Sequence, residues 1–255
     1  MRINTNVGAL TASRNSFVNN MATENSMRKL SSGLRISRAA DDAAGLAIAN
    51  KLRTQSRSLN HAAANSEQGN AMLQIAEGAA QTIQRIIERQ KELITQKLNG
   101  TSSSDTTTTI NSEITTLQSE AVRVRADANF QGTSVFASLS FQVSDNSTNG
   151  SFSVDASLTL TTLDGTSTLA NADSALTAVN NTLANIGAGQ NRLDYTVQNL
   201  KSAVVNVRAA ESTIRDVDMA EEMATFTRNN ILTQAAQAML SQANQGSQGV
   251  LQLLR

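Results

Sequence analysis

The sequence predicts a mainly α-helical protein: a long antiparallel coiled-coil-like helical bundle with one small β-hairpin region, in which the N- and C-terminal helices pair. Three observations lead to this prediction. The 255 residues include no Pro, the strongest helix breaker. Aromatic residues make up only 3% of the chain, so a compact core would lack its usual large side chains. Apolar residues recur at alternating three- and four-residue steps, the spacing of helices that pack lengthwise.

The N-terminal segment, residues 3–27, carries the first apolar seam. Its members are Ile3, Val7, Leu10, Phe17 and Met21, and Arg14 interrupts the series. Further along, Ser31-Ser32-Gly33 weakens the helical pattern, and Asp41-Asp42 offers an N-cap with a favourable negative charge. We therefore expect a new helix to start after this acidic pair.

Two helices are predicted next, over residues 43–99 and 105–128. The first contains no helix breaker stronger than glycine, and about 55 residues at about 1.5 Å each give a helix roughly 80 Å long. No single compact core spans that length, so this helix must pack lengthwise against others. The turn-forming residues 99–105 separate it from the second helix, which we expect to fold back on the first.

Residues 131–168 change to a period of two and predict a β-hairpin with a polar tip at 144–150. The alternating apolar residues are Leu139, Phe141 and Val143, then Phe152, Val154, Leu158 and Leu160. The longest helical seam follows over 176–214, and its natural partners are the helices at 43–99 and 105–128.

The C-terminal segment carries no charged residue from Asn229 to Leu254. Its seam consists of Leu232, Ala236, Met239, Ala243, Gly246, Val250 and Leu253. Solvent-exposed helices usually carry many Lys and Glu, so uncharged polar faces with small residues suit close packing among copies of the same helix. The alternative is a buried terminal helix of a monomer, which we would expect to be more apolar.

Several classes of function are excluded by composition. The chain has no Cys and a single His, so thiol nucleophiles, Cys zinc sites and His-based triads lack their members. Adjacent carboxylates such as Asp41-Asp42 and Glu221-Glu222 point to different sides of a helix, which suits capping better than catalysis. We therefore expect a protein without enzymatic activity, metal or cofactor.

Charge and hydropathy also limit the partners. Residues 1–60 hold nine Lys and Arg against three Asp and Glu, whereas residues 61–200 hold seven against thirteen. The basic charges are scattered and Phe17 is the only aromatic among them, so we do not expect nucleic-acid binding. Residues 1–27 have no sustained apolar run and no cleavage pattern, and no stretch reaches about 18 apolar residues. We expect no membrane span, and either a cytoplasmic protein or export that reads no cleavable leader.

Several motifs resemble those of a known family. Residues 30–36, Leu-Ser-Ser-Gly-Leu-Arg-Ile, followed by residues 41–49, Asp-Asp-Ala-Ala-Gly-Leu-Ala-Ile-Ala, are similar to the N-terminal signature of bacterial flagellins. Matching motifs also occur at residues 3–6, 191–195, 238–245 and 250–255. The resemblance covers roughly residues 1–130 and 170–255. It implies a structural subunit that self-assembles into the flagellar filament for motility, in a short form that lacks large outer variable domains.

The hook–filament junction protein shares these terminal signatures and is the alternative. The near-complete match at both ends favours flagellin. The copy number would separate the two, because a filament contains thousands of flagellin subunits and a junction is a ring of a few subunits.

The resemblance also implies an organisation along the chain. Residues 1–43 and 225–255 would form the inner-core helices, residues 44–130 and 169–224 the outer tube, and residues 131–168 the variable β-hairpin region. Polymerisation would involve the two chain ends through Ile3, Val7, Leu10, Phe17, Leu232, Met239, Val250 and Leu253.

The resemblance implies several partners besides the chain itself. They are the flagellar cap and hook-junction proteins, and an export chaperone that holds roughly residues 215–255. The protein would leave the cell by the flagellar type III route, without a cleaved signal peptide, and reside in the extracellular filament. Some flagellins are sensed by a toll-like receptor of animal hosts, and here Arg89, Leu93 and Glu113 match the receptor-contacting positions.

Overall fold

A computed structural model describes residues 6–99, 103–144 and 150–253, with side chains up to residue 246. The chain forms two compact units. We call residues 1–54 and 207–255 the terminal unit, and residues 55–206 the central unit. The mainly α-helical fold predicted from the sequence is confirmed.

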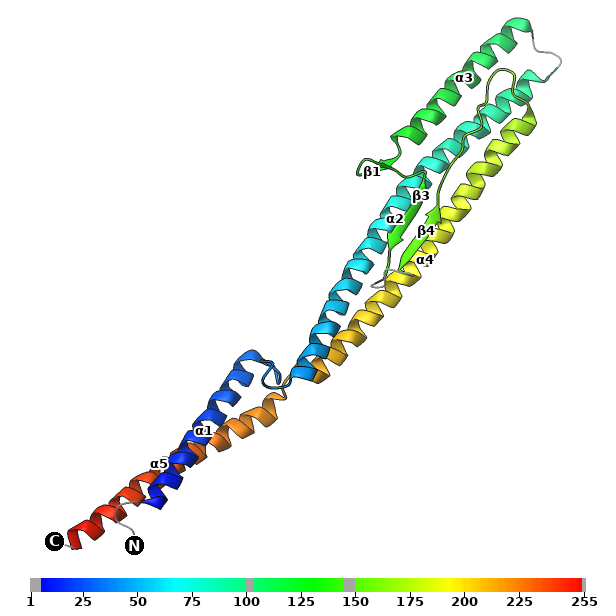
Figure 1. The fold of residues 1–255 in the computed structure, drawn as a ribbon. Coiled ribbons are helices and arrows are strands. Elements are labelled where there is room, and N and C mark those ends of the chain that lie inside the picture. Colours follow the sequence, from blue (N-terminus) through cyan, green and yellow to red (C-terminus); the bar gives the residue numbers. More distant parts are fainter. Residues whose placement is uncertain (1–5, 100–102, 145–149, 254–255) are drawn as a thin grey trace. The chain divides into compact units, whose positions relative to one another are not determined.

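The terminal unit pairs α1 (Val7–Ser32) with α5 (Met219–Leu253), and Figure 1 shows the two helices side by side. Contacts at both ends show that they run antiparallel. The side-chain amide of Asn6, just before α1, contacts Ala243 near the end of α5, and Lys29 at the end of α1 pairs with Glu222 at the start of α5. The predicted pairing of the terminal helices is therefore confirmed.

The connection between α1 and α2 (Ala43–Lys97) is held by polar contacts at both of its ends. Gly33 caps α1 with a φ of 68°, a left-handed conformation that glycine adopts without strain. Asp42 accepts a 2.9 Å hydrogen bond from the backbone N–H of Gly45 and so caps α2, as the acidic pair in the sequence predicts. The backbone N–H of Arg35 also donates to the carbonyl of Arg215 at 2.7 Å, which ties the connection to the C-terminal part of the terminal unit.

The central unit is built on α2, α3 (Ser104–Asp127) and α4 (Leu169–Arg215). These bounds confirm the helices predicted over 43–99, 105–128 and 176–214. The core between them is aliphatic, and its fully buried side chains include Leu73, Ile83, Ile94, Ile114, Ile186 and Leu193. Ion pairs join α2 to α4 at two levels, Glu67 with Lys201 at 2.8 Å and Lys91 with Asp173 at 2.6 Å.

The segment between α3 and α4 holds two small antiparallel hairpins rather than one. β3 (Ser138–Gln142) pairs with β4 (Ser151–Asp155), which confirms the predicted hairpin, although its tip at 145–149 lies outside the described residues. The second strand is shorter than predicted and ends before Leu158, because the Asp155 carboxylate accepts hydrogen bonds from the backbone and side chain of Ser157 and turns the chain.

The additional hairpin joins β1 (Asn129–Phe130) to β2 (Thr133–Ser134). Gln131 and Gly132 form its two-residue turn and have φ values of 50° and 81°. A type I′ hairpin turn needs positive φ at both of these positions.

The β3–β4 hairpin lies along α2 and α4 (Figure 1), and a glycine on each helix makes room for it. A Cβ atom at Gly69 would lie 3.0 Å from the Phe141 ring, and one at Gly189 would lie 2.8 Å from a methyl group of Val154. The guanidinium of Arg192 lies 4.4 Å from the centroid of the Phe152 ring and adds a cation–π contact.

Candidate functional site

The contact between α1 and α5 is made largely of small side chains. On α1, one series of buried and half-buried positions recurs at three- and four-residue steps: Ala9, Ala12, Ser16, Asn19, Thr23, Ser26 and Leu30. The matching series on α5 is Phe226, Asn229, Thr233, Ala236, Leu240 and Ala243. Ala22, Arg28, Lys29, Glu222 and Thr225 are also half-buried. Most of these side chains are small, and Leu30, Phe226 and Leu240 are the large apolar ones, so the contact buries little large apolar surface.

The large apolar residues of the predicted N-terminal seam lie outside this contact. Val7, Leu10 and Phe17 are 65%, 72% and 65% exposed. The three–four spacing correctly predicts the helix, but the seam that meets α5 is formed by the neighbouring small residues. α1 therefore carries two stripes, a small one used within the chain and a large one left uncovered.

α5 shows the same arrangement. Leu232 and Met239, both predicted as polymerisation residues, are exposed, and so are Met219, Met223 and Ile231. Of the other predicted residues, Ile3 lies outside the described residues. Val250 and Leu253 belong to α5, but their side chains lie beyond residue 246, where the described side chains end.

We call the exposed large apolar residues of α1 and α5 the exposed apolar set: Val7, Leu10, Phe17, Val18, Met21, Met27, Met219, Met223, Ile231, Leu232 and Met239. Sequence reasoning did not assign a polymerisation role to Val18, Met21, Met27, Met219, Met223 or Ile231. Val18 and Ile231 directly follow or precede a predicted residue, so widening each seam by one position would have found them.

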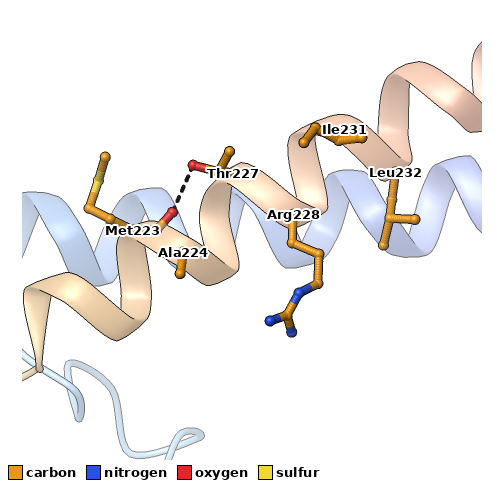
Figure 2. A pocket seen from close by; sticks show the side chains of 6 residues that line it. All are labelled: Met223, Ala224, Thr227, Arg228, Ile231 and Leu232. Atoms are coloured by element: carbon orange, nitrogen blue, oxygen red, sulfur yellow. Dashed lines mark hydrogen bonds between the residues drawn. The ribbon is translucent and has the colours of Figure 1, made fainter.

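Part of this set borders a shallow groove on the surface of α5 that is widely open to solvent. Figure 2 shows its six lining residues, which all come from α5: Met223, Ala224, Thr227, Arg228, Ile231 and Leu232. The Thr227 hydroxyl donates a 2.9 Å hydrogen bond to the carbonyl oxygen of Met223, so it is already satisfied within the helix. Arg228 adds one charged side chain to the lining, and Met223, Ala224, Ile231 and Leu232 are apolar. An apolar groove on a helix that carries no charge beyond Arg228 up to Leu254 suits a protein partner.

Two of the three residues matched to receptor contact, Arg89 and Glu113, form a charged cluster on the central unit. The Arg89 guanidinium bridges two helices: it contacts Glu92 on its own helix at 3.1 Å and Glu113 on α3 at 3.3 Å. The hydrogen bonds that the guanidinium donates to Glu92 first, and then to Glu113, raise the pKa of Arg89 above its ordinary value. Leu93 is only 2% exposed and lies in the core, so the surface at this point is formed by Arg89 and Glu113.

Gln90, next to this cluster, is a buried polar residue that sequence reasoning did not single out. Its amide nitrogen donates to the carbonyl of Ile114 at 3.1 Å and to the side-chain oxygen of Gln118 at 3.4 Å. Its own side-chain oxygen is buried without a hydrogen-bond partner. The only signal in the sequence is a polar residue between the apolar positions of a helix.

Within the described ranges, no three His, Cys, Asp or Glu side chains gather in the way that a metal site requires. No helix among the described residues has the length and hydropathy needed to cross a bilayer.

Comparison with known proteins identifies the family. The family model described as the bacterial flagellin N-terminal helical region matches residues 3–140, and that of the bacterial flagellin C-terminal helical region matches residues 169–254. Among curated relatives, a flagellin of Halalkalibacterium halodurans is 43% identical and one of Bacillus subtilis is 40% identical. The flagellar filament 33 kDa core protein of Treponema phagedenis is 38% identical. In all three pairs the alignment covers 100% of both chains.

A crystal structure of Bacillus cereus flagellin aligns with 56% of this chain and 88% of its own, with 21% sequence identity and a TM-score of 0.41. The curated relatives are named as flagellins and filament core proteins, and nothing in the comparisons favours a junction protein. Two family models that together span most of the sequence, and relatives aligned over its full length, lead to one conclusion. The chain belongs to the bacterial flagellin family and is a structural subunit of the flagellar filament.

Proposed function

We propose that the chain polymerises through the exposed apolar set of α1 and α5, and that other copies of the same chain cover it in the filament. The observation that carries this proposal is the use of small residues for the contact between α1 and α5, which leaves Leu10, Phe17 and Met239 largely exposed. Burying one such side chain contributes about 1.5–3 kcal/mol. A set of this size therefore favours association strongly once several residues are covered together.

A second copy fits this surface better than a partner of different chemistry. The C-terminal residues 229–254 carry no charge, so they offer no electrostatic means of recognising a charged partner. Mixed apolar, Ala, Gln and Asn side chains suit the close packing of like helices, and relatives aligned over the full length bear the names of filament proteins.

Seeded polymerisation tests the proposal. Purified subunits with Leu10→Ser are added to filament fragments at neutral pH, and growth is followed by electron microscopy. We expect the subunit concentration needed for growth to rise by about tenfold or more. Leu98→Ser is the matched control, because Leu98 is also largely exposed but lies at the end of α2 in the central unit. Unimpaired growth with Leu10→Ser would reject the proposal.

We also propose the division of the chain in the filament. Residues 1–43 and 225–255 form the inner core, residues 44–130 and 169–224 the outer tube, and residues 131–168 the variable region. The two compact units support a division of this kind, with their boundaries near residues 54 and 207. The relatives are structural proteins, and we assign this chain no enzymatic activity.

We further propose extracellular assembly after export by the flagellar type III route without a cleaved signal peptide. Before assembly, the groove on α5 is the natural position for an export chaperone, which would cover roughly residues 215–255. The flagellar cap and hook-junction proteins are the other proposed partners, and membership of the flagellin family supports them. Loss of chaperone binding on deletion of 215–255, measured by calorimetry, tests the chaperone site.

Recognition by a host toll-like receptor is proposed through Arg89 and Glu113, with Leu93 supporting the helix from the core. Cells carrying a reporter for that receptor should respond less to Arg89→Ala than to the unchanged protein. Arg123→Ala is a matched control, because Arg123 is also exposed and also pairs with two carboxylates, those of Glu120 and Asp127. Equal responses to both variants would contradict a specific role for Arg89.

A further inference from the structure

The methionines are distributed unevenly between the two units. Of the seven in the chain, Met1 lies outside the described residues and Met72 is buried in the core of the central unit. The other five are Met21, Met27, Met219, Met223 and Met239, all on α1 or α5. They are 48–64% exposed and form nearly half of the exposed apolar set.

Among the residues that the structure describes, these five thioethers are the most easily oxidised exposed side chains. The chain has no Cys and no Trp, and its single aromatic hydroxyl is that of Tyr195. Two-electron oxidants convert a thioether to a sulfoxide, which replaces a flexible apolar side chain by a polar, chiral one. Met72 is only 7% exposed, so the same oxidant reaches it much less readily than the five on α1 and α5.

We propose that Met21, Met27, Met219, Met223 and Met239 make assembly sensitive to oxidation: peroxide converts them to sulfoxides in the free subunit and blocks polymerisation, whereas the filament protects them. The inference rests on the proposed assembly role of the exposed apolar set. It adds a covalent modification that acts on subunits before they join.

The chemistry is a transfer of one oxygen atom. The thioether sulfur attacks one oxygen of hydrogen peroxide, an S–O bond forms and the O–O bond breaks. The departing oxygen takes up the proton of the transferred oxygen and leaves as water. Sulfur is oxidised by two electrons and peroxide is reduced by two.

A sulfoxide at these positions opposes assembly because its oxygen needs a hydrogen-bond partner once it is buried. Met223 borders the α5 groove together with Ile231 and Leu232, whose side chains cannot donate. The Thr227 hydroxyl in the same groove already donates to the carbonyl of Met223. Of the six lining side chains, Arg228 is the one that still offers N–H donors. Covering the oxidised groove with another apolar helix would therefore bury the sulfoxide oxygen without a partner or draw this charged guanidinium in with it, and either outcome costs free energy.

The first measurement compares free subunits with filaments of the full-length chain during treatment with hydrogen peroxide. Peptide mass spectrometry follows the addition of one oxygen atom at each Met. We expect the five exposed methionines to react at least about tenfold more slowly in filaments, and Met72 to react slowly in both. Equal oxidation of the five in filaments and in free subunits would overturn the inference.

The second measurement asks whether oxidation prevents growth. Oxidised subunits should fail to extend active seeds, and treatment with methionine sulfoxide reductases should restore extension, because these enzymes reverse the modification. Subunits in which all five residues are changed to Leu should extend seeds before and after peroxide. Loss of growth that the reductases do not restore, or growth of fully oxidised subunits at the normal rate, would overturn the inference.

Two partial variants keep the test usable if five changes disturb assembly themselves. One changes the α1 methionines, Met21→Leu and Met27→Leu. The other changes the α5 methionines, Met219→Leu, Met223→Leu and Met239→Leu. Each partial variant should retain part of its filament growth after peroxide. If peroxide stops the growth of both variants as fully as that of the unchanged chain, the inference is contradicted.

The result of this test can be told apart from that of the assembly proposal. If Leu10→Ser blocks growth but the methionines react equally in filaments, only the oxidation inference fails. If Leu10→Ser grows normally, the assembly proposal fails.

Discussion

The side-chain amide of Asn6 donates a 2.9 Å hydrogen bond to the carbonyl oxygen of Ala243, a residue 237 positions further along the chain. The Asn6 side-chain oxygen also accepts a 3.0 Å hydrogen bond from the backbone N–H of Ala9 and caps α1. One side chain therefore both starts the first helix and ties it to the last. This double role gives a way to separate helix capping from the pairing of the two chain ends.

Asn6→Ala should weaken the pairing of α1 and α5 more than Asn6→Asp does. Alanine removes both contacts, and each is worth about 1 kcal/mol. Aspartate keeps an oxygen for the N–H of Ala9 and loses only the donor to Ala243. The backbone amides of α1 should exchange hydrogen slowest in the unchanged chain, faster in Asn6→Asp and fastest in Asn6→Ala. Equal exchange in all three would show that the contact does not stabilise the pair.

Deleting about 20 residues from either end should abolish polymerisation while the helical body at 45–220 stays folded. Either deletion removes part of the exposed apolar set, but the aliphatic core of the central unit lies within residues 72–193. Circular dichroism and thermal melting should report a folded chain, and electron microscopy should find no filaments after seeding. Long filaments from a truncated chain would contradict the prediction.

Gly189→Ala should destabilise the central unit, whereas Gly187→Ala on the same helix should not. A Cβ atom at Gly189 would come within 2.8 Å of Val154, whose branched side chain has little freedom to move. At Gly187 it would meet nothing within 4 Å, so alanine should stabilise the helix by up to about 1 kcal/mol. Chemical denaturation of the two variants should shift in opposite directions. A second pair, Gly69→Ala beside Phe141 and Gly78→Ala in open space, repeats the test on α2.

Gln90→Glu should destabilise the central unit at neutral pH, and the stability of this variant should recover as the pH falls. The carboxylate would be buried beside the Ile114 carbonyl in place of the amide donor, and burial raises the pKa of a carboxyl group. Because the folded-state pKa is the higher one, the penalty is full above that value, shrinks as the pH falls below it, and is gone below the ordinary value of a Glu carboxyl, about 4.3. Gln90→Leu, of similar size, should melt near the unchanged chain at all pH values, because it removes the unpartnered oxygen. A melting temperature of Gln90→Glu that does not depend on pH would contradict this account.

Acid should loosen the connection between α1 and α2 through Asp41. Backbone N–H groups of Arg38 and Ser37 donate to its carboxylate at 2.9 Å and 3.1 Å, and these hydrogen bonds, that of Arg38 first, lower the pKa of Asp41. Because the folded-state pKa is the lower one, this stabilisation is complete above the ordinary value near 3.9 and is lost as the pH falls through the folded value. The amide resonances of Arg38 and Ser37 should shift below about pH 4. The same resonances should not show this transition in Asp41→Asn.

The helices were predictable because their signals are local. The absence of Pro, the cap at Asp42 and the turn residues around 99–105 act within a few positions of the chain, and α2 and α3 begin and end within two residues of the predicted bounds. The β3–β4 hairpin followed from its period of two. The β1–β2 hairpin was missed because its strands have only two residues each, too few for a periodic pattern.

What the sequence by itself determined about this protein is the type and length of its helices, their antiparallel order and the family to which it belongs. Only the tertiary structure decided which stripe of α1 meets α5, that Leu93 and Gln90 are buried, and that Gly69 and Gly189 make room for a hairpin. The physical reason is that a three–four repeat defines a stripe on a helix but not the surface that covers it. The covering surface is formed by residues far along the chain, as in the contact of Asn6 with Ala243. In a filament subunit we expect part of that surface to belong to another molecule.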